Sequence, residues 1–461
     1  MPKAFGNIST VYFVGIGGIG MSAIARHFLK ANMHVEGYDK TPTPLTQQLE
    51  KEGAQITFID AIEEISRAVG NADKNEVLVV YTPAIPAASQ LLNWFVNNGY
   101  QVKKRSEVLA ELTKNHFTIA VAGTHGKTTT CCYLAHFFKQ ANLNFTAFLG
   151  GISANYGSNY ITNGDSEEQV LIVEADEFDR SFHRLHPNIS IITSIEPDHL
   201  DIYGNYESLQ EAYQVFANQT QQGGKIIVND RFSNKILVGK ECTMHTYGLY
   251  SEQFGIQQIG VANHQFFFEL GGTGSLRFVN GLPGEHNALN ATAAMAAASE
   301  FMSYSDLSQY LPTFTGVQRR FQRIFESESS VYIDDYAHHP TELKYAIETA
   351  TKLYPERKTT VVFQPHLFSR TQDLANEFAE VLAMANELII MPIYPARELP
   401  IKGVTSNWLL SKAGKGKVLN HEQVLDYVST EKPELLLTLG AGNIDLLVPK
   451  IQSIYQKAVA V

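Results

Sequence analysis

The sequence predicts an α/β fold, and two observations carry this prediction. Short apolar runs without polar alternation recur along the chain, which is typical of parallel strands buried on both faces. Helical segments lie between many of these runs, and such alternation is the pattern of α/β proteins. The predicted strands are 11–14, 77–81, 117–121, 170–174, 189–193, 225–228, 359–363, 388–391 and 435–439. The predicted helices are 21–30, 43–52, 128–140, 209–217, 287–300, 341–353 and 374–385.

The chain has 461 residues, which is too long for one compact core and favours two to four domains. A polar break at 114–116 predicts a first domain of residues 1–114. A basic turn at 316–321 predicts a last domain of 321–461, which leaves 115–320 as the central domain. Residues 254–278 alternate in polarity and contain several glycines, so we expect an antiparallel insert there.

Composition excludes several classes of protein. The net charge of −11 argues against a nucleic-acid partner, because binding phosphates of a duplex requires an excess of Lys and Arg. The three cysteines are interpreted as small core side chains in a reducing compartment. Glycines break the first apolar run, which indicates a strand rather than a secretion signal, and no apolar stretch approaches the roughly 20 residues of a membrane span. We therefore expect a cytoplasmic protein without a membrane partner.

A Gly-rich loop follows the predicted strand 117–121. Backbone N–H groups at such a strand-to-helix turn point at a common spot, and the positive helix end adds to their attraction for phosphate. Lys127 would reach the terminal phosphates and Thr128 would coordinate Mg²⁺. The loop is a shortened variant, because the position of the usual first glycine is Val121. The predicted ATP-binding residues of this loop are Gly123, Thr124, Gly126, Lys127, Thr128 and Thr129.

Two further residues complete the predicted metal site. Glu174 ends a strand expected beside the loop and would hold Mg²⁺ directly or through water; the alternative is a solvated loop acid. His199 follows the next strand and would be a second ligand, although a lone histidine is more often structural. The predicted metal ligands are thus Thr128, Glu174 and His199.

A different Gly-rich loop lies near the start of the chain; it is called the first loop, and the loop that contains Lys127 the second loop. Gly15-x-Gly17-x-x-Gly20 follows a strand, precedes a helix and is followed by Asp39, which is the dinucleotide-binding pattern. Alone it is a weak signal: it indicates a nucleotide diphosphate but leaves open whether a nicotinamide is present. The residues predicted to hold this ligand are Gly15, Gly17, Gly18, Ile19, Gly20, Asp39 and Thr82.

Two polar loops follow strands in the last third of the chain. Residues 334–340 contain two aspartates, Tyr336 and two histidines, and residues 364–370 contain His366 and Arg370. Both follow the carboxyl ends of predicted strands, where open α/β sheets bind ligands. Ordinary turn polarity is the alternative.

In order and spacing these motifs resemble the Mur ligases over essentially the whole chain: 122–130, 174–177, 198–199, 284–287, 319–321 and 334–340. The resemblance implies an N-terminal Rossmann-like parallel sheet that binds a UDP-sugar, a central P-loop ATPase-like domain with ATP and Mg²⁺, and a C-terminal Rossmann-like domain that helps hold an amino acid. The reaction implied is the ATP-dependent ligation of L-alanine to the carboxylate of UDP-N-acetylmuramate through an acyl phosphate, the first peptide addition in peptidoglycan synthesis. A monomer or weak homodimer is expected.

The resemblance also implies roles for further residues. Asn287 and Asn290 match positions near the adenine, Asp335 matches one near the nucleotide ribose, and Arg320 joins Lys127 in cancelling phosphate charge. The implied amino-acid pocket consists of Tyr336, His338, His366 and Arg370. The catalytic residues implied are Lys127, Arg320, His199 and His338, while the base that deprotonates the amine stays open between His338 and His366.

Two departures from the family pattern bear on these roles. Leu367 stands where many members have Arg, so Arg370 is the better candidate for the carboxylate of alanine. Residues 212–214 hold no lysine where members that add later residues carry a carbamylated one. The alternatives are a muropeptide-recycling ligase that adds a preformed tripeptide, a nicotinamide-dependent oxidoreductase and a non-catalytic ATP-binding switch. The last two leave one of the two Gly-rich loops without a use.

Overall fold

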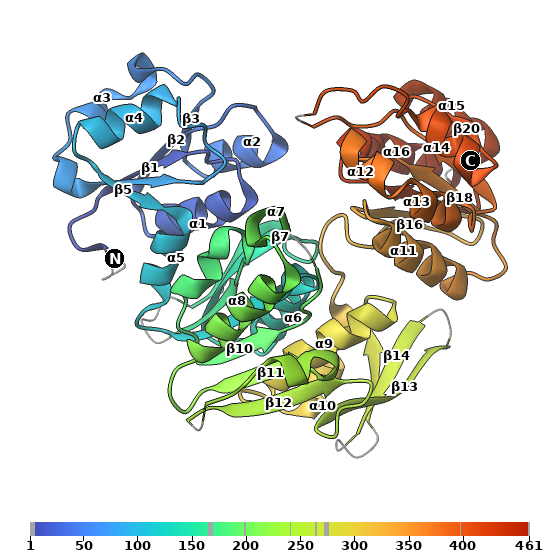
Figure 1. Cartoon of the computed structure of the whole chain (residues 1–461), viewed down its shortest axis with the longest axis horizontal. Coiled ribbons are helices and arrows are strands. Elements are labelled where there is room, and N and C mark those ends of the chain that lie inside the picture. The colour runs from blue at the N-terminus through green and yellow to red at the C-terminus, as the bar shows by residue number, and fades with distance from the viewer. Residues whose placement is uncertain are drawn as a thin grey trace. The chain divides into compact units, whose positions relative to one another are not determined.

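The computed structural model describes residues 5–164, 169–197, 200–239, 241–262, 265–271, 276–396 and 398–459 (Figure 1). Backbone contacts divide the chain into two units. The first unit comprises 1–258, 268–278 and 289–314, and the second comprises 259–267, 279–288 and 315–461.

The first sheet is five-stranded and parallel, with the order β3-β2-β1-β4-β5. The strand order reverses between β1 and β4, so their carboxyl ends flank the crevice where open sheets of this type bind ligands. The strands are β1 (Thr10–Val14), β2 (His34–Tyr38), β3 (Gln55–Thr57), β4 (Val77–Tyr81) and β5 (Gln101–Lys104). The helices are α1 (Ile19–Lys30), α2 (Pro44–Lys51), α3 (Arg67–Gly70), α4 (Gln90–Asn97) and α5 (Arg105–Thr113). This topology confirms the Rossmann-like sheet.

The second sheet has ten strands in the order β15-β14-β13-β12-β11-β10-β6-β9-β7-β8. Its strands are β6 (Phe117–Ala122), β7 (Phe145–Ser153), β8 (Ser158–Asn163), β9 (Val170–Glu174), β10 (Ile189–Ile192), β11 (Lys225–Asn229), β12 (Thr243–Gly248), β13 (Phe254–Ala262), β14 (Gln265–Leu270) and β15 (Arg277–Asn280). Its helices are α6 (Lys127–Gln140), α7 (Leu200–Tyr203), α8 (Tyr206–Asn218), α9 (Glu285–Ala298) and α10 (Tyr304–Tyr310).

Strand β6 lies inside this sheet, paired in parallel with β10 on one side and β9 on the other. The loop that follows β6 is therefore flanked by the loops that follow β9 and β10. The segment predicted as an antiparallel insert forms three strands at one edge of the sheet. Strand β13, the first of the three, pairs in parallel with β12 over a short stretch, which the sequence did not predict. Tyr247 and Gly248 of β12 lie opposite Phe254 and Gly255 of β13.

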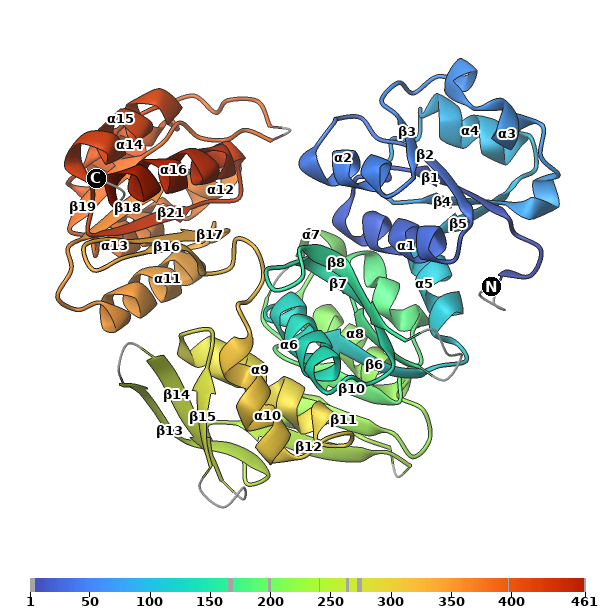
Figure 2. The ribbon, with the colours of Figure 1, turned by 180° about the vertical axis from the view of Figure 1, so that it is seen from behind.

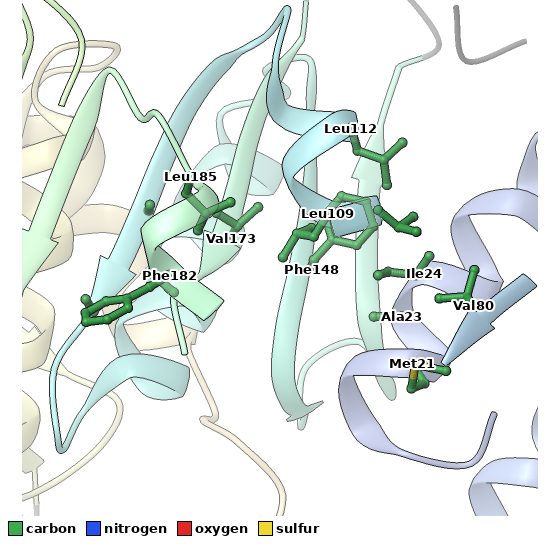
Figure 3. Close-up of a cluster of buried hydrophobic side chains, with 14 of the residues drawn as sticks. Met21, Ala23, Ile24, Val80, Leu109, Leu112, Phe148, Val173, Phe182 and Leu185 are labelled. Atoms are coloured by element: carbon green, nitrogen blue, oxygen red, sulfur yellow. The ribbon is translucent and has the colours of Figure 1, made fainter. Parts of the chain in front are cut away.

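The two sheets of the first unit share one hydrophobic core. Figure 3 shows side chains of α1, β4 and α5 in the same cluster as side chains of β7, β9 and the 3-10 helix η4 (Phe178–Arg184). The labelled members are Met21, Ala23, Ile24, Val80, Leu109, Leu112, Phe148, Val173, Phe182 and Leu185. The predicted boundary after residue 114 thus lies between two sheets that share an apolar core. Burial of apolar surface is the main stabilising term in folding, so it holds the two sheets together.

A buried polar network joins the same two sheets. Asn159 of β8 is fully buried, and its amide donates to the Ile19 carbonyl at 2.5 Å and to Ser22 Oγ at 2.8 Å. Its amide oxygen accepts from Arg26 Nη1, while Arg26 Nε donates to Glu52 at 2.8 Å. Figure 2 shows α1 alongside β7 and β8. The first turn of α1 is therefore held by a strand of the second sheet.

The second unit contains a six-stranded sheet with the order β16-β17-β21-β18-β19-β20. Only the β16–β17 pair is antiparallel among the described pairings of this sheet. Its strands are β16 (Gln322–Glu326), β17 (Val331–Asp335), β18 (Thr359–Phe363), β19 (Glu387–Ile390), β20 (Lys417–Val418) and β21 (Leu435–Leu439). The helices are α11 (Pro340–Leu353), α12 (Phe368–Asp373), α13 (Ala375–Leu382), α14 (Ser406–Ala413), α15 (His421–Glu431) and α16 (Val448–Val459). Apolar clusters cover both faces of the sheet, as the continuous apolar strands require.

In the described part of the chain no helix is both long and apolar enough to span a membrane.

Candidate active site

The loop between β6 and α6 has the backbone geometry of a phosphate cradle. Gly123 has a φ of 142° and Gly126 a φ of 83°, which are conformations that L side chains rarely adopt. A Cβ at Gly123 would meet Thr193 and one at Gly126 would meet Asn290, so neither position has room for a side chain. Asn290, predicted from the family resemblance to lie near the nucleotide, therefore packs directly on this loop.

Lys127, the first residue of α6, points back over its own loop. Its Nζ donates to the Gly123 carbonyl at 2.5 Å and to Glu177 Oε1 at 2.8 Å. Burial lowers the pKa of Lys127, but the carboxylates of Glu177 and Glu174 raise it by more, so its pKa lies above the ordinary value. The ammonium is thus charged and lies against the carbonyls of the loop, as the phosphate-binding role predicted for Lys127 requires.

Glu174 and Thr128, two of the predicted metal ligands, are in contact. Thr128 Oγ1 donates to Glu174 Oε2 at 2.8 Å, and the Gly150 N–H donates to the same oxygen at 3.0 Å. Burial raises the pKa of Glu174, and Lys127 opposes this shift. Two oxygens this close at the end of a parallel strand suit Mg²⁺, which prefers oxygen ligands and keeps several of its waters. The residues therefore fit this ion.

The third predicted ligand, His199, lies outside the described residues. Within the described residues no group of three histidine, cysteine, aspartate or glutamate side chains could hold a metal ion. Of the three predicted ligands, the described residues include Thr128 and Glu174, and the role of His199 stays a prediction.

The Gly-rich loop after β1 gathers the residues predicted for it. The N–H groups of Gly15 and Ile16 donate to the Tyr38 carbonyl, and the Gly17 N–H donates to Asp39 Oδ2 at 2.8 Å. Gly15 has a φ of 93°, and a Cβ there would lie 3.0 Å from Thr82 Cγ2. Thr82 follows β4, on the other side of the strand-order reversal. Asp39 thus shapes the loop itself, in addition to the ligand-binding role predicted for it.

In the second unit, the loops that follow β17 and β18 bring the predicted amino-acid pocket together. The rings of His338 and His366 lie 6.1 Å apart, and the ring of His366 stacks on Tyr394 at 5.6 Å. Tyr336 lies under two guanidinium groups, those of Arg319 at 5.0 Å and Arg320 at 5.3 Å.

The pKa of both histidines of this pocket lies below the ordinary value, which favours the neutral rings at pH 7. Burial lowers the pKa of His338 and of His366, and the nearby positive charge of Arg370 lowers both further. His338 Nδ1 lies 3.0 Å from the Tyr336 carbonyl, which can only accept a hydrogen bond, so Nδ1 carries the proton. Its Nε2 then carries the lone pair, as a general base requires.

Asp335 ends β17 and accepts two backbone hydrogen bonds. The donors are the N–H groups of Phe321 at 2.6 Å and Ala337 at 2.7 Å. Burial raises the pKa of Asp335 to about 7, although Arg320 opposes this shift. Asn287, at the start of α9, is buried and donates to the Pro283 carbonyl at 2.7 Å.

Some residues of the site were not predicted from the sequence. Glu177, 1% exposed, is the partner of Lys127, and its second oxygen has no hydrogen-bond partner among the described residues. Ser194 Oγ accepts from the His125 N–H at 2.9 Å and so fixes the second loop. Glu177 belongs to the motif Glu174-Ala175-Asp176-Glu177, but only the fold shows that Lys127 reaches it.

Family models match three consecutive parts of the chain: the Mur ligase family catalytic domain at residues 10–117, the Mur ligase middle domain at 121–298 and the Mur ligase glutamate ligase domain at 319–442. The chain belongs to the Mur ligase family. Within it, the chain is 42% identical to the UDP-N-acetylmuramate–L-alanine ligase of Flavobacterium johnsoniae, with 96% of this chain and 97% of the relative covered. It is also 42% identical to the enzyme of that name from Porphyromonas gingivalis, with 97% and 99% covered.

Solved structures show the same fold. The UDP-N-acetylmuramate–alanine ligase of Thermotoga maritima superimposes with a TM-score of 0.83 at 25% identity, covering 97% of this chain and 99% of that one. A murein peptide ligase of Psychrobacter arcticus superimposes with a TM-score of 0.66 at 22% identity, covering 98% of each chain. The three-domain α/β architecture predicted from the sequence is thus confirmed.

Proposed function

We propose that this protein is an ATP-dependent ligase that joins L-alanine to the carboxylate of UDP-N-acetylmuramate, the first peptide addition in peptidoglycan synthesis. The observation that carries this proposal is the identity of about 42% to enzymes of this name over nearly the full length. Two separate Gly-rich loops support it, because the reaction needs two phosphorylated substrates at once. A cytoplasmic location and a monomer or weak homodimer go with this proposal.

The first half of the reaction is a phosphoryl transfer to a carboxylate. A carboxylate is a poor electrophile, so its oxygen attacks the γ-phosphorus of ATP, ADP leaves, and the acyl phosphate then has phosphate as its leaving group. Two anions must approach, so cations stabilise the transition state. Lys127 of the second loop supplies one cation, and Arg320 is proposed to supply another. Mg²⁺ bound by Thr128 and Glu174, with His199 as the third proposed ligand, would neutralise phosphate charge.

The second half is the attack of the alanine amine on the acyl phosphate, which releases phosphate. The incoming ammonium must lose a proton first. The neutral His338, with its lone pair on Nε2, suits this role, and His366 is the second candidate. Arg370 is proposed to bind the alanine carboxylate, with Tyr336 as part of the same pocket. Asn287, Asn290 and Asp335 are proposed to contact the nucleoside part of ATP.

One assay tests the reaction itself: phosphate release from ATP in the presence of UDP-N-acetylmuramate, with L-alanine, with the preformed tripeptide or with no amine. We expect release to require L-alanine. Release that prefers the tripeptide would identify the recycling ligase instead, although the greater similarity to the alanine ligase structure than to the murein peptide ligase argues against it. Release that ignores both amines would contradict the proposal.

Arg370→Ala should raise the KM for L-alanine about tenfold or more and leave the KM for ATP unchanged, because a charge-assisted bond to the substrate carboxylate is lost. Initial rates at saturating ATP and UDP-N-acetylmuramate measure this. Arg323→Ala is the matched control, because Arg323 lies in the same unit and pairs with Glu326, and both side chains are exposed on β16. An unchanged KM for alanine in Arg370→Ala would remove this residue from the pocket.

Glu342→Gln should move the acidic limb of kcat/KM for L-alanine to lower pH. The Glu342 carboxylate lies 3.4 Å from His338 Nδ1 and stabilises the protonated imidazole, so it raises the pKa of His338. Without that charge the pKa falls, and the neutral, active form persists to lower pH. The Gln side chain can still accept from the backbone N–H of His338. A limb at the wild-type pH would show that another group titrates.

A further inference from the structure

Arg105 is a cation at the ligand-binding edge of the first sheet that the proposed reaction has not yet used. It is the first residue of α5 and directly follows β5, so it lies at the same carboxyl edge as the Gly-rich loop after β1. Its guanidinium lies against the start of α1: a Cβ at Gly20 would be 2.6 Å from Arg105 Nη1 and 3.2 Å from Cζ. Figure 1 shows α5 next to α1.

The same guanidinium has a counter-ion in the second sheet. Arg105 Nη2 lies 3.3 Å from Asp176 Oδ2, and the two side chains are 22% and 38% exposed. Asp176 follows β9, two residues after Glu174, and its charge raises the pKa of both Lys127 and Glu174. Arg105 therefore lies between the start of α1, which directly follows the first loop, and Asp176, which follows β9 beside the second loop.

We propose that Arg105 binds the diphosphate of the UDP-sugar and that Asp176 is the counter-ion it exchanges for this ligand. The proposal rests on the function proposed above, which places a nucleotide diphosphate at the first loop. A guanidinium presents paired N–H groups that match two phosphate oxygens, and a partly exposed ion pair at 3.3 Å is weak enough to be exchanged.

This proposal also explains the third glycine of the loop motif. In dinucleotide-binding folds that glycine permits close packing of helix on strand. Here the space beside Gly20 is filled by the Arg105 side chain, whose Nη1, Cδ and Cζ are the three nearest atoms to a Cβ at that position. Any side chain at position 20 would displace the guanidinium from the start of α1.

The test uses calorimetric titration of the full-length enzyme, without ATP, against UDP, uridine, UDP-N-acetylglucosamine and UDP-N-acetylmuramate. Arg105→Gln should raise the Kd for UDP and for both UDP-sugars about tenfold or more, and leave the Kd for uridine unchanged. Arg105→Lys, which keeps the charge but loses the paired geometry, should lie between Arg105→Gln and wild type. Lys103→Gln is the matched control for charge, because Lys103 is two residues away and lies over the Phe5 ring.

Two further variants separate ligand binding from folding. Gly20→Ala should weaken UDP binding without lowering the Tm, because alanine is the better helix former and only the guanidinium has to move. Asp176→Asn should lower the Kd for UDP, since the competing carboxylate is gone. The same substitution made in the Arg105→Gln variant should leave the Kd for UDP unchanged.

The outcomes that overturn the proposal are distinct. A Kd for UDP within twofold of wild type in both Arg105→Gln and Gly20→Ala removes Arg105 from the diphosphate site. Weakening confined to UDP-N-acetylmuramate assigns the guanidinium to the sugar acid's carboxylate instead. A wild-type enzyme that binds no UDP overturns both this inference and the proposed function, whereas one that binds UDP with unchanged variants overturns this inference alone.

Discussion

Lys127→Ala is expected to lower the rate of alanine-dependent phosphate release by about 10³-fold or more, the range that loss of a well-placed transition-state cation produces. The ammonium lies over the loop, 2.5 Å from the Gly123 carbonyl, and its pKa is above the ordinary value, so it is charged throughout the working pH range. No other described cation of the first unit lies within hydrogen-bond distance of this loop's carbonyls. Steady-state assays at saturating substrates measure the loss.

The same substitution has a cost in stability that can be separated from its effect on catalysis. It leaves Glu177, which is 1% exposed, without its cation, and removing one partner of a buried pair costs about 3 kcal/mol. Urea unfolding of Lys127→Ala and of the double variant Lys127→Ala, Glu177→Gln should show the loss in the first and its recovery in the second. Phosphate release should stay low in both.

Lys139→Ala is the matched control for Lys127. Lys139 is in the last turn of the same helix, and its Nζ donates to the Thr162 carbonyl at 3.2 Å. It should retain wild-type activity. Activity in Lys127→Ala within tenfold of wild type would contradict the phosphate-binding role of the second loop, whatever the control shows.

Glu174→Gln is expected to lower turnover about 10²-fold or more and to raise the Mg²⁺ concentration needed for half-maximal rate. The amide removes the negative charge but keeps an oxygen that can accept from Thr128 Oγ1 and the Gly150 N–H, so the local structure should persist. Since burial disfavours the Glu174 carboxylate, the variant without ligands should be no less stable than wild type. A Mg²⁺ titration of the initial rate, with Tm as the second readout, measures both effects.

Glu196→Gln is the matched control for Glu174. Glu196→Gln removes the same charge close to the same loop, because the Glu196 carboxylate lies 3.5 Å from His125 Nε2. The Glu196 side chain is 52% exposed, however, and is not one of the proposed metal ligands. It should leave the Mg²⁺ dependence unchanged. If Glu174→Gln and Glu196→Gln shift that dependence equally, general electrostatics rather than metal ligation would account for the effect.

The strands that the sequence predicted are the apolar ones. Strands β1, β4, β9, β18 and β21 are continuous apolar runs inside parallel sheets, and both of their faces are buried, so composition alone identifies them. Strand β2 was expected to end at Asp39, but it was given no bounds because its sequence His-Val-Glu-Gly-Tyr is half polar. It is nevertheless largely buried: Glu36 accepts from Ser66 Oγ at 2.6 Å, and Gly37 leaves room for Ile16. Its polar residues are satisfied by partners distant in sequence, which no local pattern reveals.

Helix ends were predicted well where a capping signal is present. The expected helix 43–52 begins with Thr43 as its N-cap, in a capping box with Thr46 and with Pro44 in the first turn. The expected helix 341–353 begins one residue earlier, at Pro340. Helix α9 was predicted at 287–300 but begins at Glu285 and ends at Ala298. Both ends were placed two residues too late, because its alanine-rich sequence carries no capping signal.

The sequence was enough to predict the two phosphate loops, because a glycine motif between a strand and a helix is a local pattern whose backbone fixes its chemistry. It also determined the α/β class and, through the order of its motifs, the family. Which charges meet is visible only in the folded chain: Lys127 pairs with Glu177, fifty residues on, and Arg105 pairs with Asp176, seventy-one residues on. Coulomb and hydrogen-bond energies depend on distance in space, and no single segment specifies the pairing of β6 with β9 or the packing of the first sheet, which contains β5, against theirs.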